Sequence, residues 1–217
     1  MARHLGAAPP RRRVSVFAFH LLYAALWLAF GCGHSLLADA RVKARLKPYL
    51  RAGYRLAYNL FALLHVALTV AAGWVLLGGA EPFTRPAWLV PAQWAMTLIG
   101  AGVLVAALFR YDLGRFAGTA QLRAAAQGRF LDDEEPLNLS GFHRYVRHPL
   151  YAGAFLLLWG RVADEFTLAT AVWASLYLWI GSRYEERRLL ARFGEAYARY
   201  RETVPAFFPW KGRAFRA

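Results

Sequence analysis

Long stretches without a charged residue set the first constraint on how this chain can fold. The stretches Val14–Leu37, Leu56–Gly78 and Ala87–Phe109 contain no Asp, Glu, Lys or Arg. A transmembrane helix needs roughly 20 predominantly apolar residues to cross a hydrocarbon core about 30 Å thick. The sequence therefore predicts an integral membrane protein with three transmembrane helices within residues 14–109.

A fourth apolar stretch, Leu150–Gly181, is too long for one helix, and three charged residues at 161–165 interrupt it. One continuous span would place all three near the bilayer centre, at about 2.5–3.5 kcal/mol each on insertion scales. A turn near Val162–Asp164 would instead place them at the membrane surface. We therefore predict a helical hairpin with a short first helix, about Pro149–Val162, and an all-α bundle of about five transmembrane helices.

After Gly181 the pattern becomes amphipathic. Apolar and aromatic side chains recur mostly at three- and four-residue steps, with Arg and Glu between them; they are Tyr184, Leu189, Leu190, Phe193, Tyr197 and Tyr200. We expect a C-terminal amphipathic helix that ends near Pro205, folds under the bundle and closes a site on its cytoplasmic side. The chain is then one membrane domain, 1–217, with a disordered tail (1–13), three spans (14–109) and a functional core (138–209).

The net charge of +14 is distributed unevenly along the chain. Six Lys and Arg lie in residues 38–55, six in 110–149 and nine after Gly181, but the other two connections hold only Arg85 and Arg161. This asymmetry follows the positive-inside rule and predicts that the basic segments and the C-terminus are cytoplasmic. It favours contact with anionic lipids over nucleic acid. Five transmembrane helices and a cytoplasmic C-terminus would place the basic N-terminus outside, against this rule. The number of transmembrane helices could therefore differ from five by one.

Isolated polar residues give weaker signals. The single cysteine, Cys32, excludes an internal disulfide and a cysteine metal cluster. The acidic run 132–135 lacks the spacing of a calcium loop and is expected to be a solvated turn, so we predict no metal site. His34 either lines an acceptor tunnel or bonds a neighbouring helix, while His65 and Asn59 are expected to form interhelical hydrogen bonds.

Two polar clusters lie at opposite ends of the predicted hairpin. The first reads RYVRHPLYAG, residues 144–153, and the second contains the acidic pair Glu185-Glu186. A hairpin returns both clusters to one membrane face, where charged side chains close to lipid are costly and mark a functional site by default. Pairing of these charges with one another at the surface is the alternative.

The chemistry of the first cluster suits an organic ligand. Pro149 is favoured in the first turn of a helix, which places His148 near the N-cap and Arg147 and Tyr151 within about one turn. Arginine can grip a carboxylate or phosphate, and the acidic pair can neutralise a cation or bind ribose hydroxyls. We therefore expect a ligand with an anionic group, a cationic centre and a purine, such as S-adenosylmethionine.

These motifs resemble those of the isoprenylcysteine carboxyl methyltransferase and phospholipid methyltransferase superfamily, whose members are membrane enzymes that use S-adenosylmethionine. RYVRHPLYAG, a hairpin and EERRLLARFGEAYARYRETVP carry the resemblance over residues 138–209. The N-terminal half, with HSLLADARVKARL at 34–46, is similar to bacterial members. Those include methanethiol S-methyltransferase-like proteins and a group linked to nitric-oxide metabolism. The resemblance implies a bacterial inner-membrane protein.

The resemblance also implies roles for individual residues. The RHPxYxG element lines the cofactor site, the acidic pair takes part in cofactor binding and catalysis, and the C-terminal helix closes the site. The predicted cofactor-binding residues are Arg144, Tyr145, Arg147, His148, Pro149, Tyr151, Gly153, Glu185, Glu186, Tyr197 and Tyr200. Many members have Gly-Pro-Tyr where this chain has Gly141-Phe142-His143. Members that act on prenylated cysteine have an arginine shortly before the acidic pair.

The predicted function is methyl transfer from S-adenosylmethionine to a thiol, carboxylate or lipid-like acceptor that enters from the bilayer, with a small or amphipathic thiol favoured. A neutral thiol must lose a proton, which Glu186 or His143 could take. The catalytic candidates are therefore Glu186, His143 and Arg183, the last as the nearest match to the arginine before the acidic pair. Membrane lipids are the expected partners, and no protein partner is indicated. The alternatives are an NADPH-dependent membrane reductase and a non-enzymatic accessory or transport protein.

Overall fold

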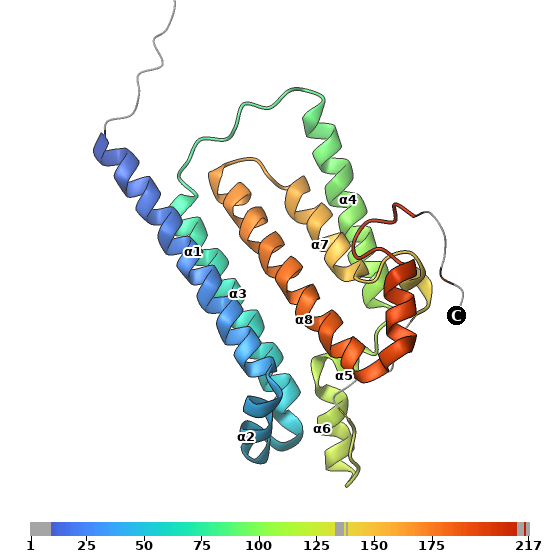
Figure 1. Cartoon of the computed structure of the whole chain (residues 1–217). Helices are drawn as coiled ribbons and strands as arrows, with labels where there is room; N and C mark the ends of the chain where they lie inside the picture. The colour runs from blue at the N-terminus through green and yellow to red at the C-terminus, as the bar shows by residue number, and fades with distance from the viewer. Residues whose placement is uncertain (1–9, 133–136, 138, 212–214, 216–217) are drawn as a thin grey trace, which may run out of the picture.

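The computed structural model describes residues 10–132, 137, 139–211 and 215, and within these ranges every regular element is a helix. The N-terminal half forms two long helices that lie side by side and are connected at one end by a short helix (Figure 1). Its elements are α1 (Pro10–Ala38), α2 (Ala40–Leu50), a 3-10 turn (Arg51–Gly53) and α3 (Tyr54–Leu77). Residues 10–13, which we assigned to a disordered tail, are therefore helical, since Pro10 suits a first helical position.

The second half adds three further helices of the bundle, α4, α7 and α8, with two short helices between α4 and α7. Its elements are α4 (Leu89–Leu108), α5 (Leu113–Ala117), α6 (Thr119–Ala126), a 3-10 turn (Gly141–Arg144), α7 (Pro149–Gly160) and α8 (Glu165–Thr203). The predicted hairpin is present as α7 and α8, with a turn at residues 161–164. Asp164 caps α8, because its carboxylate accepts from the Thr167 N–H at 2.8 Å while its own N–H donates to the Thr167 hydroxyl at 3.0 Å.

Three helical stretches are long and apolar enough to cross a membrane: Ser15–Ala38, Ala40–Leu77 (which includes α3) and Leu89–Leu108. Large apolar side chains on them remain exposed, among them Leu63 (65%) and Leu98 (68%), as expected where lipid rather than water surrounds the helices. The chain is thus an integral membrane protein with a helical bundle. The twelve residues of α7 extend only about 18 Å, less than the thickness of the hydrocarbon core.

Glycines let α4 and α7 pack backbone to backbone. A Cβ atom on Gly100 would lie 2.7 Å from the Gly153 carbonyl oxygen, and one on Gly153 would lie 2.9 Å from the Gly100 carbonyl oxygen. A Cβ atom on Gly160 would likewise lie 2.7 Å from the Gln93 carbonyl oxygen of α4. Small residues at helix contacts permit such close approach. Gly153 therefore makes room for α4, and this packing fixes the position of α7.

α8 continues well beyond its apolar half and then reverses direction. At Gly194 the backbone adopts φ 53° and ψ −128°, a conformation that residues with a side chain rarely reach. Beyond this point the helix runs back toward the start of α7 (Figure 1). The predicted amphipathic helix is thus a continuation of α8 that turns at Gly194. Its buried side chains, Tyr197, Tyr200 and Val204, pack with Leu189, Leu190 and Phe193.

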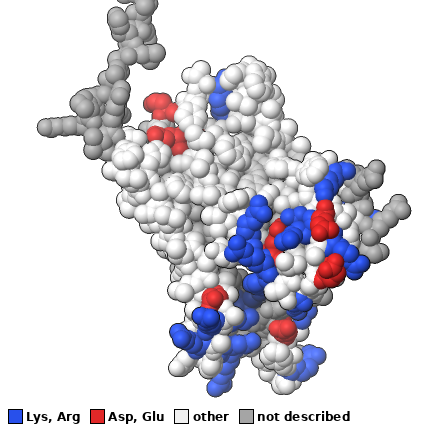
Figure 2. All heavy atoms as spheres, in the orientation of Figure 1, with Lys and Arg blue, Asp and Glu red and all other residues white. Residues whose placement is uncertain are grey.

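Charged side chains are segregated along the molecule. Lys and Arg gather on the visible face over α2, α6 and the last part of α8, whereas the surface of the long apolar helices carries almost none (Figure 2). We call this region, formed by α2, α6 and the last part of α8, the basic end. It is the arrangement expected from the loop charges. Residues 1–9 of the predicted tail and residues 133–135 of the acidic run lie outside the described residues.

Candidate functional site

The two polar clusters of the sequence meet where α7 begins and where α8 leaves the apolar bundle. The segment that follows α8 lies against them, because the N–H groups of Arg147 and His148 donate to the carbonyl oxygens of Pro205 and Ala206, both at 2.9 Å. Three segments therefore form one site: residues 143–151, the acidic pair of α8 and residues 197–207, which follow that pair in the same helix and just beyond it.

Glu186 is the centre of this site. Its side chain is buried, and one carboxylate oxygen accepts from Arg147 Nη2 at 2.6 Å, Arg147 Nε at 2.9 Å and His148 Nε2 at 3.0 Å. Burial alone would raise the pKa of Glu186, but the hydrogen bonds from His148 and Arg147 lower that pKa to about 2. The carboxylate is therefore ionised at neutral pH and is a weak proton acceptor.

His148 connects the two glutamates. Its Nδ1 lies 3.5 Å from Glu185 Oε2, an oxygen that also accepts from the Tyr151 hydroxyl at 3.1 Å. The imidazole stacks on the Tyr151 ring at 5.2 Å between centroids, and Phe207 lies 5.6 Å from its centre. Burial lowers the pKa of His148, but the two carboxylates outweigh burial and raise that pKa overall. The side chain of Glu185 is 46% exposed, so this carboxylate faces the outside of the cluster.

Two tyrosines line the inner side of the cluster; they belong to the part of α8 after Gly194, which we call the returning helix. The Tyr200 hydroxyl donates to the His143 carbonyl oxygen at 2.6 Å. The Tyr197 hydroxyl is buried without a hydrogen-bond partner among the described residues, and it interacts electrostatically with Glu186 and Arg147. A buried hydroxyl without a partner is costly, so Tyr197 marks a position where a polar group of a ligand would be stabilised.

His143 lies at the edge of the same site. Its Nδ1 is 3.2 Å from the Arg147 carbonyl oxygen and its Nε2 is 3.3 Å from the Tyr111 hydroxyl. Burial lowers the pKa of His143, so the ring is neutral at physiological pH. In the tautomer that donates from Nδ1 to the carbonyl oxygen, Nε2 accepts from Tyr111.

Other predicted site residues have different contacts. Arg144 holds the C-terminal segment, since its Nε donates to the Phe215 carbonyl oxygen at 3.0 Å. Tyr145 is 44% exposed. The guanidinium of Arg183 lies 5.3 Å from the Trp179 ring centre, and no ion pair joins it to the acidic pair, all of these residues being within the described part of the chain. Pro149 is buried at the first position of α7, where it serves helix geometry.

Sequence reasoning missed several parts of the site. Arg147 also donates from Nη1 to the carbonyl oxygens of Arg201, at 3.0 Å, and Val204. Any residue type can supply a backbone carbonyl oxygen, so these hydrogen bonds could not be predicted from a sequence pattern. Tyr111 lies outside the predicted core 138–209, and Phe207 lies within it but had no predicted role; the fold brings them to the two histidines.

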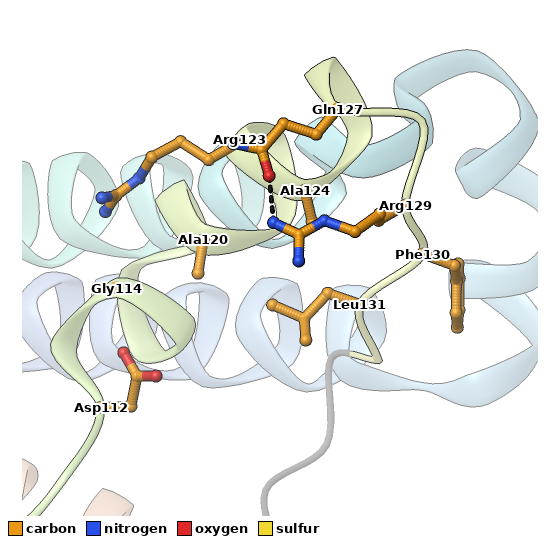
Figure 3. A pocket seen from close by; sticks show the side chains of 9 residues that line it. All are labelled: Asp112, Gly114, Ala120, Arg123, Ala124, Gln127, Arg129, Phe130 and Leu131. Carbon is orange, nitrogen blue, oxygen red and sulfur yellow. Dashed lines mark hydrogen bonds between the residues drawn. The ribbon is translucent and has the colours of Figure 1, made fainter.

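A separate pocket of about 510 Å³ lies beside α5 and α6 (Figure 3). Its lining residues are Asp112, Gly114, Ala120, Arg123, Ala124, Gln127, Arg129, Phe130 and Leu131. None of them is a predicted site residue. The carboxylate of Asp112 caps α5 by accepting from the Arg115 N–H at 3.0 Å, and Arg129 donates to Gln127. These contacts maintain the local fold, so the cluster around Glu186 is the better candidate.

Comparison with known proteins agrees with the motifs. A methanethiol S-methyltransferase of Crocosphaera subtropica is 41% identical over 75 residues, which cover 33% of this chain and 29% of that protein. One of Pseudomonas deceptionensis is 25% identical over 190 residues, covering 83% and 69%. A protein-S-isoprenylcysteine O-methyltransferase of Schizosaccharomyces pombe is 36% identical over 73 residues, covering 32% and 31%. The resemblance to the isoprenylcysteine carboxyl methyltransferase superfamily is confirmed.

The extent of these matches is limited. No protein-family model matches the chain, and no solved structure matches it. The chain spans about half the length of two further proteins to which it is similar, 52% of a methanethiol S-methyltransferase of a Pseudomonas strain and 50% of one of Mycobacterium tuberculosis. The resemblance therefore concerns the family, and the activity of this chain is a separate question.

Proposed function

We propose that this protein is a membrane methyltransferase that uses S-adenosylmethionine and transfers the methyl group to a small or amphipathic thiol. The observation that carries the proposal is the buried cluster in which Glu186 holds Arg147 and His148 while Glu185 bonds Tyr151. It combines the two motifs of the superfamily in one place. The names of the similar proteins support a thiol acceptor.

The residues present fit the cofactor. S-adenosylmethionine carries an ammonium group, a carboxylate, ribose hydroxyls and a positively charged sulfonium, which supplies an electrophilic methyl group. Glu185 has a half-exposed carboxylate that can accept from the ammonium group or a ribose hydroxyl. The buried Tyr197 hydroxyl needs a polar partner. The residues that would hold the cofactor are thus Glu185, Tyr197 and the cationic side of the cluster, Arg147 and His148.

The contribution of the protein to such a reaction is positioning in a site with little water. Methyl transfer from a sulfonium is an in-line displacement, so alignment of the acceptor contributes most. Glu186 fixes Arg147 and His148, and backbone hydrogen bonds join these two residues to the segment after α8. Tyr200 joins the returning helix to His143. The returning helix thus lies against one side of the site and shields it from water.

Binding of S-adenosylhomocysteine to the detergent-purified protein, measured by calorimetry, tests the proposal. Wild type should bind, and Glu186→Gln and Arg147→Ala should lose most of the affinity. Glu81→Gln and Arg123→Ala are matched controls on exposed residues outside the site, and we expect them to bind like wild type. A folded wild type that binds NADPH instead would point to a reductase, and one that binds neither ligand would point to an accessory role.

The acceptor class is tested with radiolabelled S-adenosylmethionine. We expect the label in the thioether product when methanethiol or a longer alkanethiol is supplied. Transfer only to a carboxylate or a lipid headgroup would retain the enzyme class but overturn the thiol assignment.

A further inference from the structure

A second polar cluster lies inside the bundle, away from the site described above. His34 of α1 and Tyr58 of α3 are joined by a hydrogen bond of 2.6 Å between His34 Nε2 and the Tyr58 hydroxyl. The His34 ring lies 5.7 Å from the Tyr177 ring of α8 and 5.8 Å from the Phe30 ring, measured between centroids. Three helices thus enclose an imidazole in a largely aromatic surrounding.

A second histidine in this region has one ring nitrogen without a hydrogen-bond partner within the described ranges of the chain. His65 lies between Phe30 and Phe61, at 5.5 Å and 5.3 Å between ring centroids. Its Nδ1 is buried without a hydrogen-bond partner among the described residues. A polar atom left unpaired in an apolar span is costly. This suggests that the region around His34 and His65 accommodates a further polar group.

The aromatic cluster is connected with the candidate cofactor site along α8. Tyr177, Gly181 and Glu185 follow at four-residue steps and therefore lie on the same side of the helix. Tyr151, which bonds Glu185 at 3.1 Å, also interacts electrostatically with Tyr177. No atom lies within 4 Å of the position that a Cβ on Gly181 would take. There is thus open space on α8 between His34 and the acidic pair.

The proposed reaction needs a proton acceptor, and the two candidates predicted for that role in the candidate cofactor site, Glu186 and His143, already make other contacts. One oxygen of Glu186 already accepts three hydrogen bonds. Both ring nitrogens of His143 face protein atoms, the Arg147 carbonyl oxygen and the Tyr111 hydroxyl. His34 differs in that only one of its ring nitrogens makes a short hydrogen bond. The Tyr58 hydroxyl lies 2.6 Å from Nε2 but 3.4 Å from Nδ1. When Nε2 donates to the Tyr58 oxygen, Nδ1 has a free lone pair.

We infer that His34 is the proton acceptor for a thiol that binds in the aromatic cluster, with Tyr58 as the residue that orients the imidazole. This inference rests on the proposed function. The thiol proton passes to His34 Nδ1, and the thiolate sulfur forms a bond to the methyl carbon. The carbon–sulfur bond of the sulfonium breaks, and its electron pair goes to the departing sulfur. The products are a thioether, S-adenosylhomocysteine and protonated His34, which releases the proton to solvent.

The test compares two thiols of different acidity. An alkanethiol is almost entirely protonated at neutral pH, whereas an electron-poor aromatic thiol is largely ionised and needs no base. We expect His34→Gln to lose at least about 100-fold in methyl-transfer rate with the alkanethiol, as is typical for a general base, but less than about tenfold with the aromatic thiol. His20→Gln is the matched control, since His20 lies on the same helix and pairs with Glu165 at 2.7 Å.

Calorimetry with S-adenosylhomocysteine separates this role from a structural one. Binding should be unchanged in His34→Gln and in Tyr58→Phe, and Tyr58→Phe should lose about tenfold in rate with the alkanethiol. Equal losses for both thiols in His34→Gln, or full activity of this variant, would overturn the role of His34 while the proposed function stands. Loss of cofactor binding in His34→Gln would also overturn it. If wild type methylates no thiol, the proposed function itself fails.

Discussion

Glu186 stabilises two cationic side chains through one buried oxygen atom. The side chains of Arg147 and His148 are 10% and 4% exposed, so neither can be solvated well if the carboxylate is removed. Glu186→Gln should therefore lower the free energy of unfolding by about 3 kcal/mol, the low end of values for removing one partner of a buried pair, since the amide oxygen still accepts a hydrogen bond. Thermal unfolding in detergent measures this.

The neighbouring glutamate provides the control. Glu185 has a side chain that is 46% exposed, and water can replace its contacts with His148 and Tyr151. Glu185→Gln should lower the free energy of unfolding by at most about 1 kcal/mol. If the two substitutions lowered the free energy of unfolding equally, burial of Glu186 would not increase its contribution to stability.

His148 should make stability depend on pH above neutrality. Its pKa is raised in the folded protein, because the contacts with Glu185 and Glu186 outweigh burial. A group with a raised folded pKa contributes stability that is fully present below the unfolded pKa of about 6.5 and is lost as pH rises through the folded pKa. The difference in unfolding free energy between wild type and His148→Gln should therefore decrease as pH rises from 6.5. The pKa of Glu186 is lowered, so its contribution to the free energy of unfolding changes with pH only below about pH 4.3, outside this range.

Titration of thermal stability between pH 5 and pH 9 provides the measurement. The His148→Gln variant should change less with pH than wild type over this range. His143, whose pKa is lowered by burial, stays in both proteins and cancels in the difference. A difference that stays constant or grows with pH would contradict the cationic state of His148.

At the level of helices, the contact between α4 and α7 positions one side of the candidate site. A Cβ atom on Gly100 would meet backbone atoms of α7, the Leu157 nitrogen at 2.6 Å and the Gly153 oxygen at 2.7 Å. Backbone atoms cannot move aside without shifting the helix, so Gly100→Ala should cost about 1–3 kcal/mol of stability. It should also weaken S-adenosylhomocysteine binding, since α7 carries Tyr151 and follows His148 directly.

Gly102, two residues further along α4, is the matched control for this substitution. No atom lies within 4 Å of the position that its Cβ would take. Gly102→Ala should be neutral or stabilising by up to about 1 kcal/mol, the difference in helix propensity between the two residues. Thermal unfolding and calorimetry on both variants give the comparison. Equal stability of the two would show that α4 and α7 are not in close contact.

The helices themselves could be predicted because the bilayer imposes a simple rule. Absence of charge over three long stretches identified α1, α3 and α4, and three charges at 161–165 placed the turn between α7 and α8. The meeting of His148 with the acidic pair followed from that turn. The sequence predicted that the C-terminal helix folds under the bundle, but not that the chain reverses at Gly194, since a glycine between helical residues is usually tolerated without a turn.

Contacts that depend on tertiary packing were beyond the sequence pattern. Gly153 fits both a ligand and a neighbouring helix, and only the fold shows that the neighbour is α4. Arg144 has the same chemistry as Arg147, yet it binds the Phe215 carbonyl oxygen rather than the acidic pair. Residue type therefore identified the region of the site, and packing decided which members of the motif contact one another.

On the scale of the whole molecule, the distribution of charge predicts how the protein lies in the membrane. Lys and Arg gather at the basic end, and the candidate site lies toward this end, where α8 leaves the apolar bundle (Figure 2). The loop between α3 and α4 holds a single basic residue, Arg85. The positive-inside rule therefore predicts that the basic end faces the cytoplasm. This orientation would give the site access to a cofactor made in the cytoplasm.

Labelling of single cysteines in intact bacterial cells tests this orientation. Cys32 is replaced by serine, and a cysteine is introduced either at Thr84, in the loop between α3 and α4, or at Gln127, at the end of α6; both positions are exposed. A membrane-impermeant maleimide should label Thr84→Cys in intact cells and Gln127→Cys only after permeabilisation. The reverse pattern would place the basic end outside. The site would then face away from the cytoplasm, and the proposed methyl donor could not reach Glu185 and Tyr197 without a transporter. Orientation is therefore a condition that the proposed function must meet independently of any assay of methyl transfer.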